Sequence, residues 1–76
     1  MTAKNTALVS ALVASILNLP EGTVSADASM ESVSKWDSLA HLNICLAFEE
    51  RFGVVLDMET IASSTSVAKL VTLIPN

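Results

Sequence analysis

The sequence predicts an all-α protein, a small four-helix bundle with a long loop between its first two helices and a short third helix. The chain has 76 residues, so we expect residues 1–76 to form a single domain. Hydrophobic residues make up 51% of the chain, and with one Trp, two Phe and no Tyr they are nearly all aliphatic. They recur at three- and four-residue steps, as on one face of a helix. One cysteine excludes an internal disulfide, so aliphatic packing has to stabilise the fold.

The first helix is predicted over residues 4–17. Its larger apolar side chains fall within one half of a helical wheel and its small and polar ones fill the other half. The first set is Leu8, Val9, Leu12, Val13, Ile16 and Leu17, and the second is Ala7, Ser10, Ala11, Ala14 and Ser15. Lys4 before an apolar stretch also resembles a bacterial secretory signal, but a signal has no need of such a face. No apolar run approaches the roughly 18 residues of a membrane span, so we expect a cytoplasmic protein without a membrane partner.

A long connection is predicted between Asn18 and Asp37. Pro20 cannot continue the first helix and Gly22 adds backbone freedom, so we expect these residues to end it. Loops of this length in compact domains are usually functional or held down by their own side chains. This loop carries five apolar residues that favour the second case, namely Leu19, Val24, Met30, Val33 and Trp36.

The second helix is predicted over residues 38–52. Asp37 is a suitable N-cap, because its carboxylate can accept hydrogen bonds from first-turn amides, and Gly53 is a suitable stop. The apolar residues of this helix form two stripes on roughly opposite sides of the wheel. The core face consists of Ile44, Cys45, Phe48 and Phe52, and the outer stripe consists of Leu39, Leu42 and Leu46.

The outer stripe predicts a contact site for partner proteins. A surface helix in a monomer needs only one apolar stripe, and we expect a monomer. Asn43, Glu49 and Glu50 flank the stripe, so it forms a small apolar patch with an acidic rim. The alternative is that the other helices cover both stripes and leave nothing for a partner.

Two short helices are predicted to close the fold. Residues 54–56 read as an extended link, after which Asp57 caps a third helix over residues 58–62. Residues 63–65 break the chain and supply the cap of a fourth helix over residues 66–74, with proline just beyond.

Composition excludes several functional classes. The formal charge of −4, from eight acidic and four basic residues, argues against a nucleic-acid partner, because phosphate backbones need clusters of Lys and Arg. No acid–base pair or metal-ligand set stands out, so we expect no catalytic residue, no metal site and no enzyme activity. His41 lies toward the core side and is predicted to be a partly buried, hydrogen-bonded residue, and Cys45 is predicted to be a buried thiol.

A family resemblance rests on both ends of the second helix. Its start reads Lys35, Trp36, Asp37, Ser38, Leu39, and residues 47–53 at its end read Ala-Phe-Glu-Glu-Arg-Phe-Gly. Together with the chain length and loop placement, this pattern resembles the acyl carrier protein family. There an Asp-Ser-Leu motif opens the second helix and an apolar-Glu-Glu-x-Phe run closes it. The resemblance covers nearly the whole chain and implies the acyl carrier type of four-helix bundle.

The resemblance also implies a cofactor and partners. Ser38 is implied to carry covalent 4′-phosphopantetheine, transferred from coenzyme A by a separate phosphopantetheinyl transferase, with Asp37 at the same cofactor-binding site. A helix start suits a phosphate, because free N–H groups and the macrodipole favour negative charge there. The arm is implied to hold an acyl thioester for acyl-loading and acyl-transferring enzymes of fatty acid or polyketide biosynthesis. The implied partner surface is Leu39, Leu42, Leu46, Glu49 and Glu50.

Three positions depart from the family pattern. Ala40 and Asn43 stand where many fatty-acid carriers have acidic residues, which favours a specialised pathway over a housekeeping one. Trp36 stands where the family often has a small residue, and we interpret it as a loop anchor packed on the bundle. Two alternatives stay open. One is an aminoacyl or peptidyl carrier of a peptide-synthesis-like system, and the other is a helical interaction domain in which Ser38 is never modified.

Overall fold

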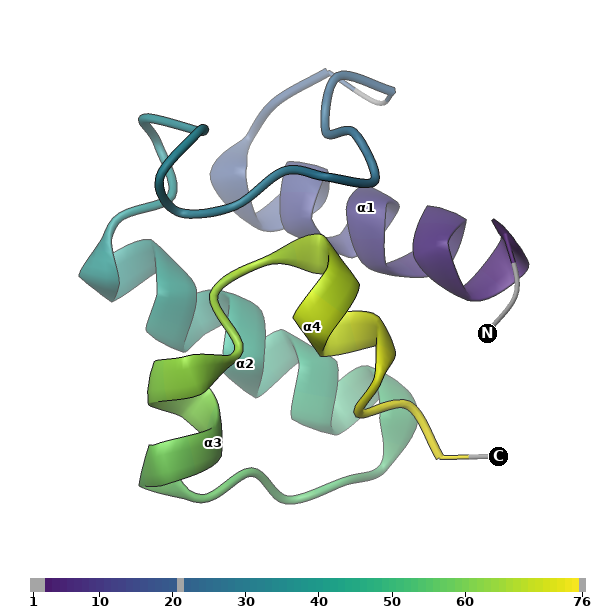
Figure 1. Cartoon of the computed structure of the whole chain (residues 1–76), viewed down its shortest axis with the longest axis vertical. Coiled ribbons are helices and arrows are strands. Elements are labelled where there is room, and N and C mark those ends of the chain that lie inside the picture. The colour runs from purple at the N-terminus through teal and green to yellow at the C-terminus, as the bar shows by residue number, and fades with distance from the viewer. Residues whose placement is uncertain (1–2, 21, 76) are drawn as a thin grey trace.

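Four helices make up the regular structure of residues 3–20 and 22–75, the part of the chain that the computed structural model describes. In chain order they are α1 (Ala3–Leu17), α2 (Ser38–Phe52), α3 (Met58–Ser63) and α4 (Val67–Val71). α1 packs against both α2 and α4 (Figure 1). The predicted all-α fold, with its long first loop and short third helix, is confirmed. None of these helices combines the length and apolar character needed to cross a membrane.

α1 ends where it was predicted to end, but for a different reason. Asn18 adopts a left-handed conformation with φ of 58°, and the Leu19 N–H donates to the Ala14 carbonyl at 2.9 Å. This is a common way for a helix to satisfy its last carbonyls, and Asn tolerates it better than most residues. Pro20 and Gly22 come after that turn, so they do not themselves stop the helix. Glu21, which lies between them, is outside the described residues.

The buried face of α1 differs in part from the predicted one. Val9, Val13 and Leu17 are buried as expected, but Ile16 is exposed and Ala14 is buried. A wheel based on side-chain size assigns the small residues to solvent, whereas close packing between helices favours a small residue at the contact. The predictions for Ile16 and Ala14 were both wrong for this reason.

Three helices and the long loop share a single hydrophobic core. Its buried side chains come from α1, α2, α4 and the loop, and none comes from α3, all of whose residues are described. α3 therefore lies at the edge of the core, below α4 in Figure 1. The core consists of Val9, Val13, Ala14, Leu17, Val24, Ala28, Trp36, Ile44, Phe48, Val67, Leu70 and Val71.

The long loop is held down, as its apolar residues predicted. Val24 and Trp36 are buried, and the other three predicted anchors are packed against the core. The loop also pairs with the segment before α4 through an antiparallel bridge between Ser29 and Ser66. Two backbone hydrogen bonds flank that bridge, from Met30 N–H to Thr65 O and from Val67 N–H to Ala28 O, each 3.0 Å long.

The caps of α2 and α3 follow local sequence signals. Asp37 caps α2, and Gly53 ends it with φ of 67°. Asp57 caps α3 by accepting the Thr60 N–H at 2.7 Å, and α3 runs one residue beyond its predicted end. Both acidic N-caps and the glycine stop are confirmed.

α4 is shorter than predicted at both ends. Its N-cap is Ser66, which accepts the Lys69 N–H at 3.1 Å, so the cap does not come from residues 63–65. α4 ends at Val71, and the following turn has tighter i to i+3 bonds, including Ile74 N–H to Val71 O at 3.2 Å. A residue before proline disfavours the α conformation, which explains why the helix does not continue to Ile74.

The Asp57 cap makes α3 dependent on pH in a defined direction. Hydrogen bonds from the backbone and then the side chain of Thr60 hold the pKa of the Asp57 carboxyl below its usual value. The cap therefore contributes stability above the unfolded-state pKa, and that contribution is lost as pH falls through the lower folded-state pKa.

Asp57→Ala should lower the melting temperature by a few degrees near neutral pH, and the difference from the parent should shrink toward pH ~2. Asp57→Asn keeps a capping acceptor and should lose less at neutral pH. Thermal melts followed by circular dichroism measure both effects. A deficit of Asp57→Ala that stays constant across the pH range would contradict the role assigned to the charge.

Candidate functional site

The start of α2 presents an exposed serine. Ser38 is the first residue of the helix, and its side chain faces solvent. Asp37 before it is extended, with φ of −96° and ψ of −176°, and its carboxylate accepts the Ala40 N–H at 2.8 Å. Within residues 3–20 and 22–75, the Ser38 hydroxyl has no hydrogen-bond partner. Its oxygen is therefore open to reaction from the solvent side.

The electrostatics of this position suit a phosphate ester. The first-turn N–H groups of α2 and the positive end of its macrodipole lie beside the Ser38 side chain. Asp37 adds a negative charge nearby, but that carboxylate is used to cap the Ala40 amide. An exposed hydroxyl at a capped helix start therefore fits the attachment of an anionic group.

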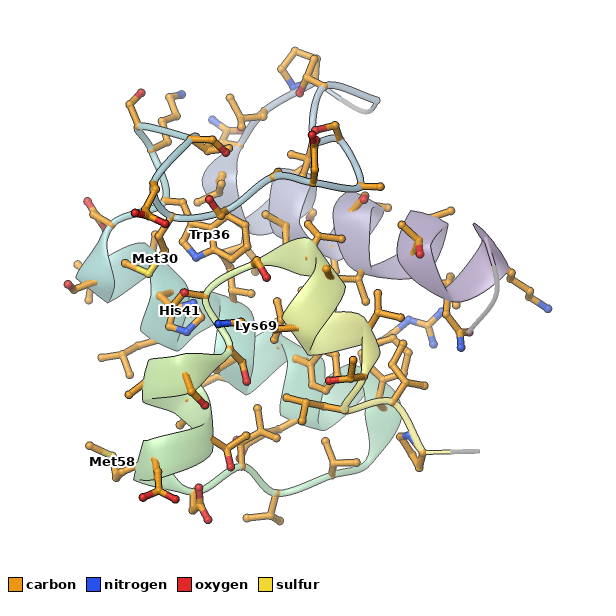
Figure 2. The ribbon with its side chains drawn as sticks, viewed as in Figure 1. Met30, Trp36, His41, Met58 and Lys69 are labelled. Carbon is orange, nitrogen blue, oxygen red and sulfur yellow. The ribbon has the colours of Figure 1, made fainter. Side chains whose placement is uncertain are left out.

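The chain around Ser38 is anchored from inside the fold. Trp36, two residues earlier, is only 1% exposed and is among the largest fully buried side chains. Its Nε1–H donates to Nδ1 of His41 at 3.0 Å (Figure 2), and His41 Nε2 lies 2.7 Å from the Ile61 carbonyl of α3. The interpretation of Trp36 as a loop anchor is confirmed. His41 is hydrogen-bonded as predicted, and it is buried rather than partly buried.

The outer stripe of α2 is exposed, as predicted. Leu39 is 70% exposed, Leu46 is 63% exposed and Leu42 is 46% exposed. On the other side of the helix, Ile44, Cys45 and Phe48 are buried. The alternative in which neighbouring helices cover both stripes is therefore wrong. α2 keeps one apolar stripe in the core and presents the other to solvent.

The two glutamates of the expected acidic rim, Glu49 and Glu50, differ in exposure and in hydrogen bonding. Glu50 is exposed, whereas Glu49 is half-buried and its carboxylate accepts the Leu56 N–H at 2.7 Å. The Glu49 carbonyl also accepts from Gly53 and Val54. Glu49 therefore holds the turn after α2 in place, which the sequence pattern did not indicate.

Two exposed apolar residues were missed by the sequence reasoning. Val55 is 93% exposed in the link between α2 and α3, and Met58 is exposed at the start of α3. Alternation along residues 54–56 was a usable signal, because in an extended segment the middle side chain points opposite to its neighbours. Val54 and Leu56 pack toward the core, and Val55 points away from it.

Cys45 is a buried free thiol, as predicted. Burial raises the pKa of this thiol, and the charge of Glu49 raises it further. The thiol therefore stays protonated near neutral pH, and a protonated thiol is a poor nucleophile.

The arrangement suits the covalent attachment of a group to the Ser38 hydroxyl and the docking of another protein on the apolar stripe of α2. Among the described residues, no group of three or more His, Cys, Asp and Glu side chains is placed to hold a metal ion. What the site offers is one exposed hydroxyl at a helix start, beside an apolar stripe on the same helix.

Comparison with known families agrees with this geometry. A family model described as "Phosphopantetheine attachment site" matches residues 7–74, which include all of α2, α3 and α4. Proteins of that family bind 4′-phosphopantetheine covalently on a serine. No curated protein matches the chain.

The reactivity of Cys45 tests whether the core face of α2 is buried as described. In the native, unmodified protein, Cys45 should react with a small thiol reagent near pH 8 at least about a hundredfold more slowly than a free cysteine. After denaturation, one thiol per chain should react at the normal rate, since this is the only cysteine. Reagent absorbance measures the rate, and Cys45→Ala is the control that should give no signal. Fast labelling of the native protein would contradict the raised pKa and the burial.

Proposed function

This chain belongs to the phosphopantetheine attachment family, and we propose that it is an acyl carrier protein with its arm attached to Ser38. The observation that carries the assignment is the exposed Ser38 hydroxyl at the capped start of α2. The cofactor of the family needs a serine that a transferase can reach, and a helix start favours the phosphate that joins it.

Each residue near the attachment point has a role in this proposal. The arm supplies a terminal thiol, on which an acyl group is held as a thioester. In this proposal the Ser38 oxygen forms the phosphoester bond and loses its hydroxyl proton, while the pyrophosphate bond of coenzyme A breaks and adenosine 3′,5′-bisphosphate leaves. Asp37 orders the first turn of α2 through its cap on Ala40, and Trp36 fixes the chain just before it. Bond-making and bond-breaking on the acyl group then belong to partner enzymes, so the carrier itself is not an enzyme.

We assign the partner surface to Leu39, Leu42, Leu46, Glu49 and Glu50. The exposure of the three leucines on the helix that begins with Ser38 supports this assignment. Exposed apolar side chains with a charged rim are typical of protein contact sites. Val55 and Met58 add exposed apolar area on the following link and on α3.

A specialised pathway of fatty acid or polyketide type is the form of the proposal that we favour. Asn43 is exposed and uncharged, Ala40 carries no charge, and Glu49 already accepts a backbone hydrogen bond. The free negative charge along α2 is therefore reduced, and apolar contacts carry more of the recognition. The cytoplasmic location and the monomeric state expected from the sequence remain part of this proposal.

The first experiment tests attachment. The unmodified protein is incubated with coenzyme A, magnesium and a broad-specificity phosphopantetheinyl transferase, and its intact mass is measured beside that of Ser38→Ala. The parent should gain one phosphopantetheine and the variant none. No gain with several transferases, from a parent shown to be folded, would leave an unmodified interaction domain as the function.

A second experiment identifies the cargo. The modified protein is offered fatty acyl, malonyl and aminoacyl donors with their loading enzymes, and thioester formation is followed by mass. Loading with acyl groups supports the proposal. Loading only with an amino acid, by an adenylating enzyme, would replace it with an aminoacyl or peptidyl carrier.

The partner surface is tested with a matched pair of variants. Leu46→Gln removes an exposed apolar contact from α2, and Ile16→Gln makes the same change at an exposed residue of α1. We expect Leu46→Gln to lower kcat/KM for the transferase by about tenfold, the size of a contact central to an interface, and Ile16→Gln to leave it nearly unchanged. Because apolar contacts dominate, the parent's kcat/KM should depend only weakly on salt. Equal effects of the two variants would move the partner surface away from α2.

A further inference from the structure

The core side of α2 near the attachment point is filled by large side chains. Trp36, two residues before Ser38, is among the largest fully buried side chains. The buried residues of α2 itself are His41, Ile44, Cys45 and Phe48. Close-packed interiors leave few voids larger than a water molecule. A group that enters the bundle from Ser38 would therefore have to displace some of these side chains.

The polar atoms of this region are paired as well. The Trp36 indole N–H can only donate, and Nδ1 of His41 accepts its hydrogen at 3.0 Å. The opposite ring nitrogen, Nε2, lies 2.7 Å from the Ile61 carbonyl, so the ring joins the loop and α2 to α3. Within residues 3–20 and 22–75, no buried side-chain nitrogen or oxygen lacks a hydrogen-bond partner. Displacing either ring would leave such atoms unpaired, which is costly.

α3 and the link before it close one side of α2. His41, Cys45 and Glu49 are four residues apart, so they lie along one line of the helix. The Ile61 carbonyl meets His41 at one end of this line. At the other end, the Leu56 N–H donates to the Glu49 carboxylate at 2.7 Å. The segment between these two contacts runs antiparallel to α2 and is bonded to it at both ends, so separating α3 from α2 would break hydrogen bonds.

A surface hollow of about 240 Å³ lies between α1 and the long loop. Its lining residues come from α1 and from the first part of that loop, and none comes from α2 or α3. They are Ala7, Ser10, Ala11, Gly22 and Val24. This hollow therefore adds no space between α2 and α3.

Outside the bundle, the apolar surface beside Ser38 is the partner surface that we assign above. Its exposed leucines are Leu39, Leu42 and Leu46. A long acyl chain in water would lie against them, because apolar groups gain by leaving water together, and it would cover the surface that a partner needs. A short acyl group, or one with polar substituents, has little apolar area to bury and would leave the leucines uncovered.

We propose that Trp36 and His41 determine which acyl groups this carrier suits: they keep the cargo outside the helix bundle, and the cargo is a short or polar acyl group rather than a long fatty acyl chain. The inference rests on the proposed function, since it concerns the cargo of an arm on Ser38. The two residues act by filling the interior beside α2 and by bonding the loop, α2 and α3 together. Acyl groups of this class have only a few carbons, or carry hydroxyl, keto or carboxyl groups that water already solvates well.

The test attaches acyl arms of increasing length. A broad-specificity phosphopantetheinyl transferase is given the unmodified protein and acetyl-, hydroxybutyryl-, hexanoyl- or decanoyl-coenzyme A, and intact mass confirms each product. The melting temperature of each product is compared with that of the protein carrying the free arm. We expect no rise in melting temperature with chain length. The indole N–H resonance of Trp36, the single tryptophan, should keep its position in every product.

A variant with space near the attachment point gives the opposite expectation. Trp36→Leu removes much of the buried ring and its N–H. Its hexanoyl and decanoyl forms should melt a few degrees above its free-arm form, because the acyl chain fills the vacated space. Val13→Ala also makes space in the core, but from α1, and it leaves the bonds of Trp36 and His41 in place. This control should show no such rise.

Two results would overturn the inference. One is a melting temperature of the parent that rises by several degrees from the acetyl to the decanoyl form while the Trp36 indole resonance moves, a result that does not depend on the folding of any variant. The other is a folded Trp36→Leu whose loaded forms gain no more than those of Val13→Ala. A failure of every coenzyme A substrate to add mass would instead refute attachment to Ser38, and with it the proposed function itself.

Discussion

The buried hydrogen bond between Trp36 and His41 is the interaction on which the geometry of this protein depends. It joins the last turn of the long loop to the first turns of α2, and the far side of the same ring continues to α3. Buried polar groups have to be paired, so these partners leave little freedom to the segment between them. That segment contains Asp37 and Ser38. The chain on both sides of the exposed serine is therefore held by a buried contact.

The four helices contribute unequally to the core, because a chain of this size can bury only a limited amount of surface. α1, α2 and α4 form the hydrophobic core together with three loop side chains, Val24, Ala28 and Trp36. α2 still leaves three leucines exposed, and α3 contributes no buried side chain. Exposed apolar residues lower solubility, and the partner contact that we propose for α2 would account for them.

Local signals predicted much of the secondary structure correctly. Asp37 and Gly53 set both ends of α2, and Asp57 set the start of α3, because caps act through contacts a few residues apart. Local signals predicted the structure less well where a distant segment of the chain also makes contacts. The cap of α4 is Ser66 rather than an earlier residue, in a segment that pairs with the loop at Ser29. Which residues of α1 are buried likewise depends on the helices that pack on it, so Ala14 and Ile16 were assigned to the wrong faces.

By itself the sequence determined the fold class, the two apolar stripes of α2 and the serine at its start, since helical periodicity and the Asp-Ser-Leu motif are properties of neighbouring residues. Tertiary structure alone decided which groups meet across the chain. It paired Trp36 and His41 with the Ile61 carbonyl, turned Glu49 toward the Leu56 amide, and left Met58 in solvent. Such contacts join residues whose spacing carries no pattern. Their partners are chosen by the way the helices and the loop pack, which no local window of sequence contains.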